Sequence, residues 1–309
     1  MVALSTADFA NYEVKRRSSA MYTLQRRQVK DKLRQLAQEI EAIVGADLDG
    51  LQTVFSDEAP SLVNHHSVDS QWLTWLRSDE ASSKLRSLQG ELKLTAPDAL
   101  DIAPHHRHAH LAVVVDDRFL ETSLRIHRRA MVDRENLAAR VKDSWARDGI
   151  VELLKGCGPG YCFGAVSGRE LPAQDVAEAN AESVNAWVSA AQGYDWLCVA
   201  ATCSIEDAEA LGEGLAAACA ERLQPLLALY RFVAWAQDND HIAAKKAIKE
   251  ARAEQQRAGF AKGDQVRILA GLWAGRRGTI EDVDKKGGVK VAVGLVSVKV
   301  KVDEVAALS

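Results

Sequence analysis

The chain has 309 residues, of which 47% are hydrophobic and 27% charged, and its formal net charge is −4 at pH 7. This composition is close to that of an average globular protein and excludes wholesale disorder. No window holds 18 uninterrupted apolar residues, so we expect no membrane-spanning helix and no membrane partner. The first residues form no signal-peptide h-region, and five cysteines is an odd number in a chain long enough to build its own core. Both features favour a cytoplasmic location.

Charge is distributed unevenly along the chain. Residues 260–309 contain nine basic and six acidic residues, and residues 13–34 contain eight basic and two acidic ones, whereas the remainder is acidic. Two basic segments at the ends of an acidic body indicate anionic partners at those ends.

The first 93 residues read as a helical N-terminal region. Residues 6–44 lack glycine and proline, which predicts one long helix that ends at Gly45. A second helix is predicted over Gln71–Leu88. About three heptads are marginal for an independent coiled coil, so the long helix is expected either to dimerise or to pack on the protein's own body. Its apolar residues form a narrow seam: Tyr22, Val29, Leu33, Leu36, Ile40 and Ile43.

The pattern changes near Leu94, and residues 94–240 predict a central α+β domain with a small sheet. Two β-rich runs, 110–115 and 119–126, flank Asp116-Asp117, which is typical of a tight hairpin. Residues 241–259 are helical by propensity but poor in large apolar side chains, and they predict an exposed helical spacer. Further strands are predicted over 161–166 and 196–203, and helices over 133–147, 150–154 and 173–191, after Ser204, and from a first turn that holds Pro225.

Residues 260–309 predict several short strands joined by glycine-containing turns. Such short strands bury little as an open sheet, so a small closed barrel is the simplest arrangement. Gly278 is expected at a positive φ or at a close backbone approach. The pattern rests on Gly263-Asp264-x-Val266-Arg267-Ile268, on Gly275-x-x-Gly278-Thr279-Ile280, and on Val289-x-Val291-x-Val293.

This pattern resembles a KOW motif in an SH3-like barrel, as in the C-terminal domain of NusG-type transcription factors and in several ribosomal proteins. The resemblance covers about 50 of the 309 residues. It implies binding to RNA or DNA, or to a protein of a transcription or translation complex. The preceding 250 residues do not resemble the domain before this barrel in NusG, and residues 293–298 are shorter than the corresponding stretch, so the partner can differ. The expected anion contacts are Arg267, Arg276, Arg277, Lys285 and Lys286.

The central hairpin brings polar side chains to one face. A turn at Asp116-Asp117 places His110 opposite Ser123 and, by alternation, gathers one polar face: His106, His108, His110, Glu121, Ser123, Arg125 and His127. One hypothesis is a divalent metal such as zinc, bound by His106, His108, His110 and His127. Another is proton transfer by His110, Glu121 and His127, with Arg125 holding an anionic substrate group. A solvated or partner-facing surface is the third.

Other sequence signals are weak. The pairs Cys157/Cys162 and Cys198/Cys203 are spaced more widely than usual zinc knuckles, and buried small hydrophobic residues are the favoured interpretation. The sequence holds no P-loop, dinucleotide fingerprint, nucleophile elbow or HExxH motif, and no cofactor is required by it.

The sequence therefore predicts an α+β protein with a helical N-terminal arm, a central small-sheet domain, a helical spacer and a small SH3-like β-barrel. The favoured function is that of a non-enzymatic adaptor or regulator, which docks on an RNA-, transcription- or translation-related complex through the barrel. One alternative is an enzyme that uses the His/Glu/Arg face, with the barrel as a targeting module. Another is a structural protein–protein module of a larger assembly.

Overall fold

The chain forms two compact units, Met1–Asp240 and His241–Ser309, in a computed structural model. The mixed α+β class is confirmed. Within the described ranges, no helix has the length and apolar character needed to cross a membrane. The predicted spacer over 241–259 lies almost wholly outside these ranges. The structure describes residues 1–62, 64–83, 103–190, 193–242, 260, 262–269, 273–283, 288–294, 296–301 and 304–307.

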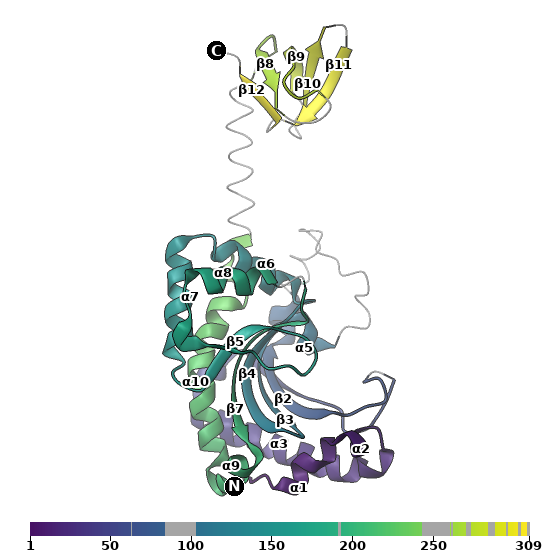
Figure 1. Cartoon of the computed structure of the whole chain (residues 1–309), viewed down its shortest axis with the longest axis vertical. Helices are drawn as coiled ribbons and strands as arrows, with labels where there is room; N and C mark the ends of the chain where they lie inside the picture. The colour runs from purple at the N-terminus through teal and green to yellow at the C-terminus, as the bar shows by residue number, and fades with distance from the viewer. Residues whose placement is uncertain are drawn as a thin grey trace. The chain divides into compact units, whose positions relative to one another are not determined.

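The first unit is built on a seven-stranded antiparallel sheet with the order β1-β2-β3-β4-β7-β5-β6 (Figure 1). The strands predicted over 161–166 and 196–203 are confirmed as β5 and β7. The strands are β1 (Leu51–Phe55), β2 (Ser70–Arg77), β3 (Ala109–Asp116), β4 (Phe119–His127), β5 (Tyr161–Val166), β6 (Gln174–Asp175) and β7 (Trp196–Ser204).

The predicted helix over Gln71–Leu88 is wrong in its first part, which is strand β2. Trp72, Trp75 and Leu76 fit a helical stripe, but most β2 side chains on both faces are buried, and a strand buried on both faces shows the same dense apolar content. Because β2 pairs with β3, the N-terminal region and the central domain are not separate at residue 93/94. One hydrophobic core extends from Val2 to Ala234.

The predicted long helix over residues 6–44 is divided into α1 (Thr6–Phe9), α2 (Val14–Arg17) and α3 (Thr23–Val44). The break before α3 is made by a polar side chain, since the Ser19 hydroxyl accepts from the Met21 amide and competes with helical pairing. The seam packs on the protein's own body, because α3 contacts β2 and α10 (Leu215–Val233). Four seam residues are at most 1% exposed, namely Val29, Leu33, Leu36 and Ile40.

The remaining helices differ from the predicted ranges mainly at their ends. Asp143 ends the helix predicted over 133–147, because its carboxylate caps a new helix by accepting from the Ala146 amide. Asn180 caps another in the same way, so the helix predicted over 173–191 starts later. These helices are α5 (Pro104–Arg107), α6 (Met131–Arg140), α7 (Ser144–Gly156), α8 (Ala181–Ser189), α9 (Ile205–Ala210) and α10 (Leu215–Val233).

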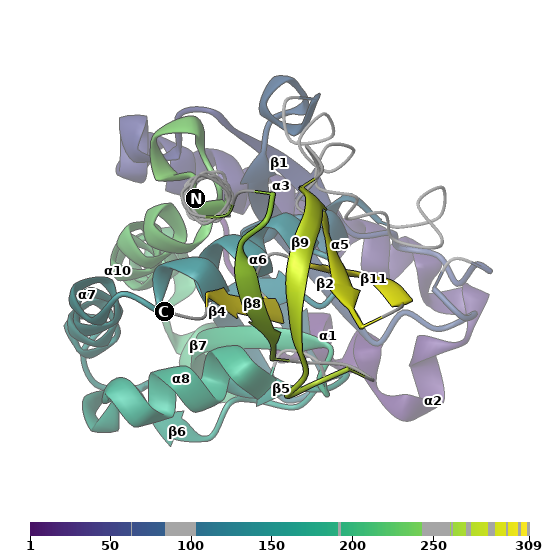
Figure 2. The same ribbon diagram turned by 90° about the horizontal axis from the view of Figure 1, so that it is seen from above.

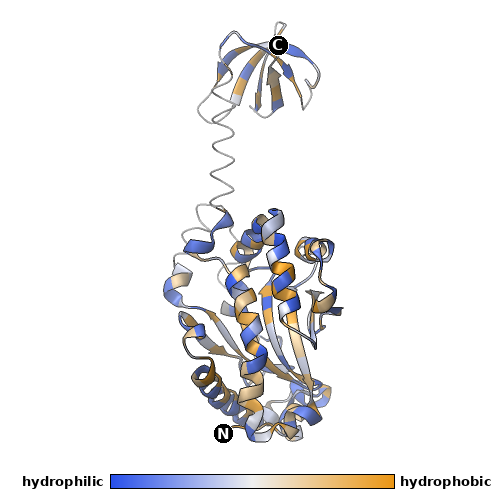
Figure 3. Ribbon diagram, turned by 90° about the vertical axis from the view of Figure 1, so that its left-hand side faces the viewer, coloured by the Kyte–Doolittle hydropathy of each residue, from blue (hydrophilic) through white to orange (hydrophobic). Residues whose placement is uncertain are grey.

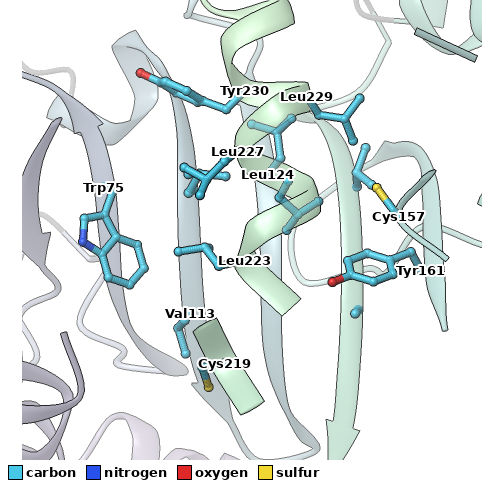
Figure 4. Close-up of a cluster of buried hydrophobic side chains, with 14 of the residues drawn as sticks. Trp75, Val113, Leu124, Cys157, Tyr161, Cys219, Leu223, Leu227, Leu229 and Tyr230 are labelled. Atoms are coloured by element: carbon cyan, nitrogen blue, oxygen red, sulfur yellow. The ribbon is translucent and has the colours of Figure 1, made fainter. Parts of the chain in front are cut away.

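Helix α10 covers the middle of the sheet and lies between α3 and α7 (Figure 2). Its side chains Leu223 and Leu227 meet Val113 of β3 and Leu124 of β4 (Figure 4). Pro225 lies inside α10 and not in its first turn, which corrects the prediction. Pro225 has no amide N–H, so the Glu221 carbonyl one turn earlier has no helical donor. The carbonyl of the next residue, Arg222, accepts a hydrogen bond from the Tyr161 hydroxyl at 2.5 Å.

A buried ion pair ties the ends of several elements together. Asp133 of α6 is fully buried and accepts from Arg77 Nη2 at 2.8 Å, from the Ala109 amide at 2.7 Å and from the Trp235 amide at 2.8 Å. Arg77 also donates to the Trp235 carbonyl at 2.7 Å. The ends of β2 and α10 and the start of β3 therefore meet at one carboxylate.

The second unit contains a curled five-stranded antiparallel sheet with the order β11-β10-β9-β8-β12, which is compatible with an SH3-like barrel. Hydrophobic and hydrophilic residues alternate along its strands (Figure 3), and the inward set forms a separate core. The strands are β8 (Gln265–Ile268), β9 (Arg277–Val283), β10 (Gly288–Val293), β11 (Val296–Lys301) and β12 (Val305–Ala307).

Gly278 lies where two strands approach closely. Such a close approach is one of the two reasons that the sequence predicts for a glycine at this position. A Cβ at this position would lie 2.5 Å from the Ala292 carbonyl oxygen and 2.5 Å from Val291 Cγ1. Real Cβ atoms do not tolerate such contacts, so only glycine fits at this crossing of β9 and β10.

Replacing Asp133 with alanine is expected to cost about 3–5 kcal/mol of unfolding free energy, because it leaves the Arg77 charge buried without its partner. Denaturant unfolding of the full chain measures this. Asp31→Ala is the control, since the Asp31–Arg34 pair is more than half exposed on both sides, and we expect it to change stability by less than about 0.5 kcal/mol. Equal effects of the two substitutions would contradict the importance of the buried pair.

Gly278→Ala is expected to destabilise the C-terminal sheet by about 1–3 kcal/mol, since the added methyl group overpacks against backbone. Hydrogen exchange of the β9 and β10 amides in the full chain reports it. The neighbouring Thr279 is exposed, so Thr279→Ala serves as the control and should leave exchange nearly unchanged.

Candidate functional site

The hairpin of β3 and β4 turns one residue later than predicted. The Asp116 carboxylate accepts from the amides of Arg118 at 2.8 Å and Phe119 at 3.1 Å, which makes Asp117-Arg118 the turn. His110 therefore pairs with Arg125 and not with Ser123. A shift by two residues moves each partner along the strand but keeps it on the same face. The part of the predicted polar face that lies on β3 and β4 is thus observed with a corrected register, namely His110, Glu121, Ser123, Arg125 and His127.

Four histidines and two tryptophans meet on this face; we call them the histidine cluster, namely Trp72, His105, His106, His110, His127 and Trp196. The sequence predicts that His106 lies on the same strand as His110. The structure instead places His106 in helix α5, which begins at Pro104. Its ring nevertheless stacks on His127, with 4.0 Å between centroids and 14° between planes.

Three members of the cluster were not anticipated from the sequence. The ring centroid of His105 lies 4.3 Å from that of Trp72 and 4.2 Å from that of His106. The ring centroids of Trp196 of β7 and His127 lie 4.5 Å apart. For His105, the available signal was the Pro104-His105-His106 sequence, which indicates the start of a helix. For Trp196 there was no local signal, because the pairing of β4 with β7 is a long-range contact.

The four histidines of the cluster are neutral at pH 7. Burial is the main cause that lowers the pKa of His105 to about 2 and that of His106 to about 4. Burial likewise lowers the pKa of His110 to about 3 and that of His127 to about 3, with smaller effects from neighbouring histidines and arginines. A proton on any ring would be placed in a poorly solvated site among other rings.

His108 points away from the cluster, which corrects its predicted place on the polar face. Its Nδ1 lies 3.0 Å from Arg77 Nη1 and its Nε2 lies 3.2 Å from the Ser82 hydroxyl. A guanidinium only donates, so Nδ1 accepts and the proton is on Nε2. His108 therefore donates to Ser82 in this tautomer, and it is not placed to act as a base on that hydroxyl.

The predicted zinc site is not formed. Within the ranges described above, no three His, Cys, Asp or Glu side chains are placed to hold a metal ion. His108 lies apart from the other three expected ligands, and the stacked rings of His106 and His127 face one another rather than a common point. The cysteines Cys157, Cys198 and Cys203 are buried and free, and burial raises the pKa of Cys157 and of Cys198 to about 12.

Glu121 and Arg125, the proposed proton-transfer and anion-binding residues, satisfy one another. Arg125 Nη2 lies 2.7 Å and Nε 2.9 Å from the two oxygens of Glu121, whose side chain is 2% exposed. Arg125 Cζ also lies over the Trp196 ring, 5.6 Å from the ring centroid. Although burial opposes the charge of Arg125, Glu121 raises its pKa above the ordinary value. This bidentate pair supports the packing of the cluster and leaves little capacity for a substrate.

The basic residues predicted for the barrel include a group of three that we call the arginine row: Arg267, Arg276 and Arg277. Arg267 of β8 pairs directly with Arg277 of β9, and all three side chains are exposed. None has a carboxylate partner in the described part of the chain. Lys290 differs, because its Nζ lies 3.1 Å from Glu281. Lys285 and Lys286 lie outside the described residues.

Like charges opposite each other on neighbouring strands are destabilising. Among the described residues, Glu281 pairs with Lys290 but no carboxylate pairs with the arginine row, so a bound anion would relieve its repulsion. The arginine row is therefore a candidate site for an anionic ligand.

The histidine cluster makes stability depend on pH. In the folded chain, the pKa values of the four cluster histidines lie below the ordinary value of about 6.5. Below that pH the unfolded chain therefore binds more protons than the folded chain. The contribution of the cluster to the unfolding free energy is complete above about pH 6.5 and is lost as the pH falls. The unfolding free energy should fall by about 1.4 kcal/mol per pH unit for each histidine that titrates. Urea unfolding between about pH 6.5 and 5 measures this slope.

His106→Phe keeps a stacking ring and removes one titrating group, so it should make this slope shallower by one proton. His65→Asn is the control, because His65 is exposed and its φ of 53° is one that asparagine adopts readily. Equal slopes for the wild type and His106→Phe would show that the cluster does not set the acid sensitivity.

Comparison with known proteins adds no assignment. No protein-family model and no curated protein matches this chain. The functional argument therefore rests on the residues and geometry described above.

Proposed function

We propose that this chain is a non-enzymatic adaptor that binds RNA through its C-terminal sheet, and that this sheet is a KOW-type SH3-like barrel. The observation that carries the proposal is the cross-strand pair Arg267/Arg277, which is exposed and has no carboxylate partner among the described residues. The curled five-stranded order and the close crossing at Gly278 support the barrel assignment.

Phosphate groups suit this surface for a physical reason. Guanidinium groups bind phosphate through paired N–H donors, and Arg267 and Arg277 stand on neighbouring strands. A polyanion that bridges them replaces repulsion by attraction and releases counterions, which makes the affinity strongly salt-dependent. Arg276, which precedes Arg277 in the chain, is also exposed.

The enzyme alternative receives less support from the first unit. Its candidate residues are either neutral and packed against other rings, as His110 and His127 are, or paired with each other, as Glu121 and Arg125 are. A general base works best with a pKa near the operating pH, and the histidine pKa values lie far below it.

The double substitution Arg267→Ala/Arg277→Ala tests the proposal. Binding of the full chain to a fluorescent single-stranded RNA is followed by anisotropy over a salt series, with single-stranded DNA of the same sequence as a second probe. We expect the slope of log K against log salt to fall by about 0.7 for each phosphate that the variant no longer neutralises.

Lys290→Ala is the matched control, since that lysine is already paired with Glu281, and it should change binding little. Failure of the wild type to bind RNA at low salt would refute the proposal, as would equal binding by the double variant. In either case a protein partner for the barrel, the structural-module alternative, would become the favoured function.

A further inference from the structure

Strand β1 forms one edge of the seven-stranded sheet. It pairs with β2 and, among the described residues, with no strand on its other side. Its five residues, Leu-Gln-Thr-Val-Phe, are uncharged and half-buried. An uncharged edge strand presents unpaired N–H and C=O groups to which another strand can bind. The strand contains no residue of the histidine cluster or of the arginine row.

The other three described edge strands carry protection that β1 lacks. Strand β6 has only two residues, one of which is Asp175, and Pro172 precedes it closely. In the second sheet, β12 has three residues, and β11 carries Lys299 and Lys301. Short length, proline and lysine all prevent edge strands from pairing with other chains. Of these four edges, β1 is therefore the one best suited to accept a further strand.

Hydrogen bonds at both ends of β1 show which of its backbone groups point outward. The Ser56 amide donates to the Trp72 carbonyl at 3.0 Å, and the Ser78 amide donates to the Gly50 carbonyl at 3.3 Å. In an antiparallel ladder every second residue bonds to a given neighbour, so positions 52 and 54 also bond to β2. The remaining residues direct their N–H and C=O groups away from β2, namely Leu51, Thr53 and Phe55.

These outward-facing residues are self-complementary. If two copies of β1 pair antiparallel about a two-fold axis through Thr53, every outward N–H and C=O group finds a partner. Leu51 of each copy then lies opposite Phe55 of the other, which buries apolar surface twice. No charge is placed opposite another charge within the strands. A register shifted by two residues would leave one outward residue of each copy unpaired, so the two-fold register is preferred.

The charges near the ends of β1 are partly compensated within each copy. The ion pairs there are Lys30–Glu58, Arg231–Asp47 and Arg34–Asp31. The other described charges beside the strand ends include four exposed carboxylates: Asp49, Asp57, Asp79 and Asp238. In the antiparallel pair, Asp49 of one copy comes near Asp57 of the other. Salt screens such repulsion between exposed charges, so pairing should become tighter as ionic strength rises.

We propose that β1 is a dimerisation edge, at which a second copy of this chain adds its own β1 antiparallel and continues the sheet. The self-complementary outward groups and the absence of charge on the strand select a second copy as the occupant. The association is weak, because one pair of five-residue strands buries less surface than a standard protein interface. This interface is independent of RNA binding by the arginine row.

Sedimentation equilibrium of the full chain tests the proposal over about 1–300 μM, the range of weak specific association. We expect a reversible monomer–dimer equilibrium that becomes tighter between low and high salt. Asp57→Asn removes the repulsion at both ends of the interface, so at low salt it should tighten the dimer by about two- to threefold.

Thr53→Pro removes the outward N–H at the two-fold axis and leaves the bonds between β1 and β2 in place. Because each dimer loses two hydrogen bonds, the dissociation constant should rise at least about tenfold. Thr53→Val is the matched control. It loses the same hydroxyl, which donates to Glu41 at 2.5 Å, but it keeps the N–H. It should dimerise within about twofold of the wild type. Thermal unfolding verifies that each variant is folded.

Hydrogen exchange of the wild type locates the interface without any substitution. The amides of Leu51, Thr53 and Phe55 should exchange more slowly as the protein concentration rises, whereas those of β6 should not change. The proposal is overturned if the wild type stays monomeric, if salt weakens the dimer, if Thr53→Pro dimerises as the wild type does, or if exchange at β1 does not depend on concentration. A monomer at every concentration would make a strand of another protein the favoured occupant of this edge.

Discussion

The buried ion pair of Arg77 and Asp133 is the interaction on which the first unit depends. Its two charges lie where water does not solvate them, so each must be compensated fully within the protein. The compensation comes from segments far apart in the chain: the end of β2, the start of β3 at Ala109, helix α6, and Trp235 after α10. The pair therefore holds the ends of two neighbouring strands and the end of the helix that covers the sheet in one arrangement.

Two features that bear on function follow from this pair. On one side it binds His108 through Nδ1, which removes that histidine from the cluster and sets its tautomer. On the other side it uses all but one donor of Arg77 and saturates Asp133, so both buried charges are compensated within the fold.

The two units treat charge differently. In the first, Glu121 and Arg125 are buried and paired, and the histidines beside them are neutral. In the second, Arg267 and Arg277 face each other across strands and are exposed. Residues that suggest catalysis in the sequence serve packing in the structure, whereas the arginine row keeps its charge available. This contrast underlies the preference for an adaptor over an enzyme.

The sequence by itself determined what depends on local periodicity and turn chemistry. It predicted the α+β class, the face on which His110, Glu121, Arg125 and His127 lie, and the need for glycine at position 278. Strand alternation explains why a register error of two residues left that face intact. Only the tertiary structure decided that Gln71 lies in a strand, that His105 and Trp196 join the cluster, and that His108 leaves it. Strand pairing, ring contacts and buried ion pairing join residues that are distant along the chain.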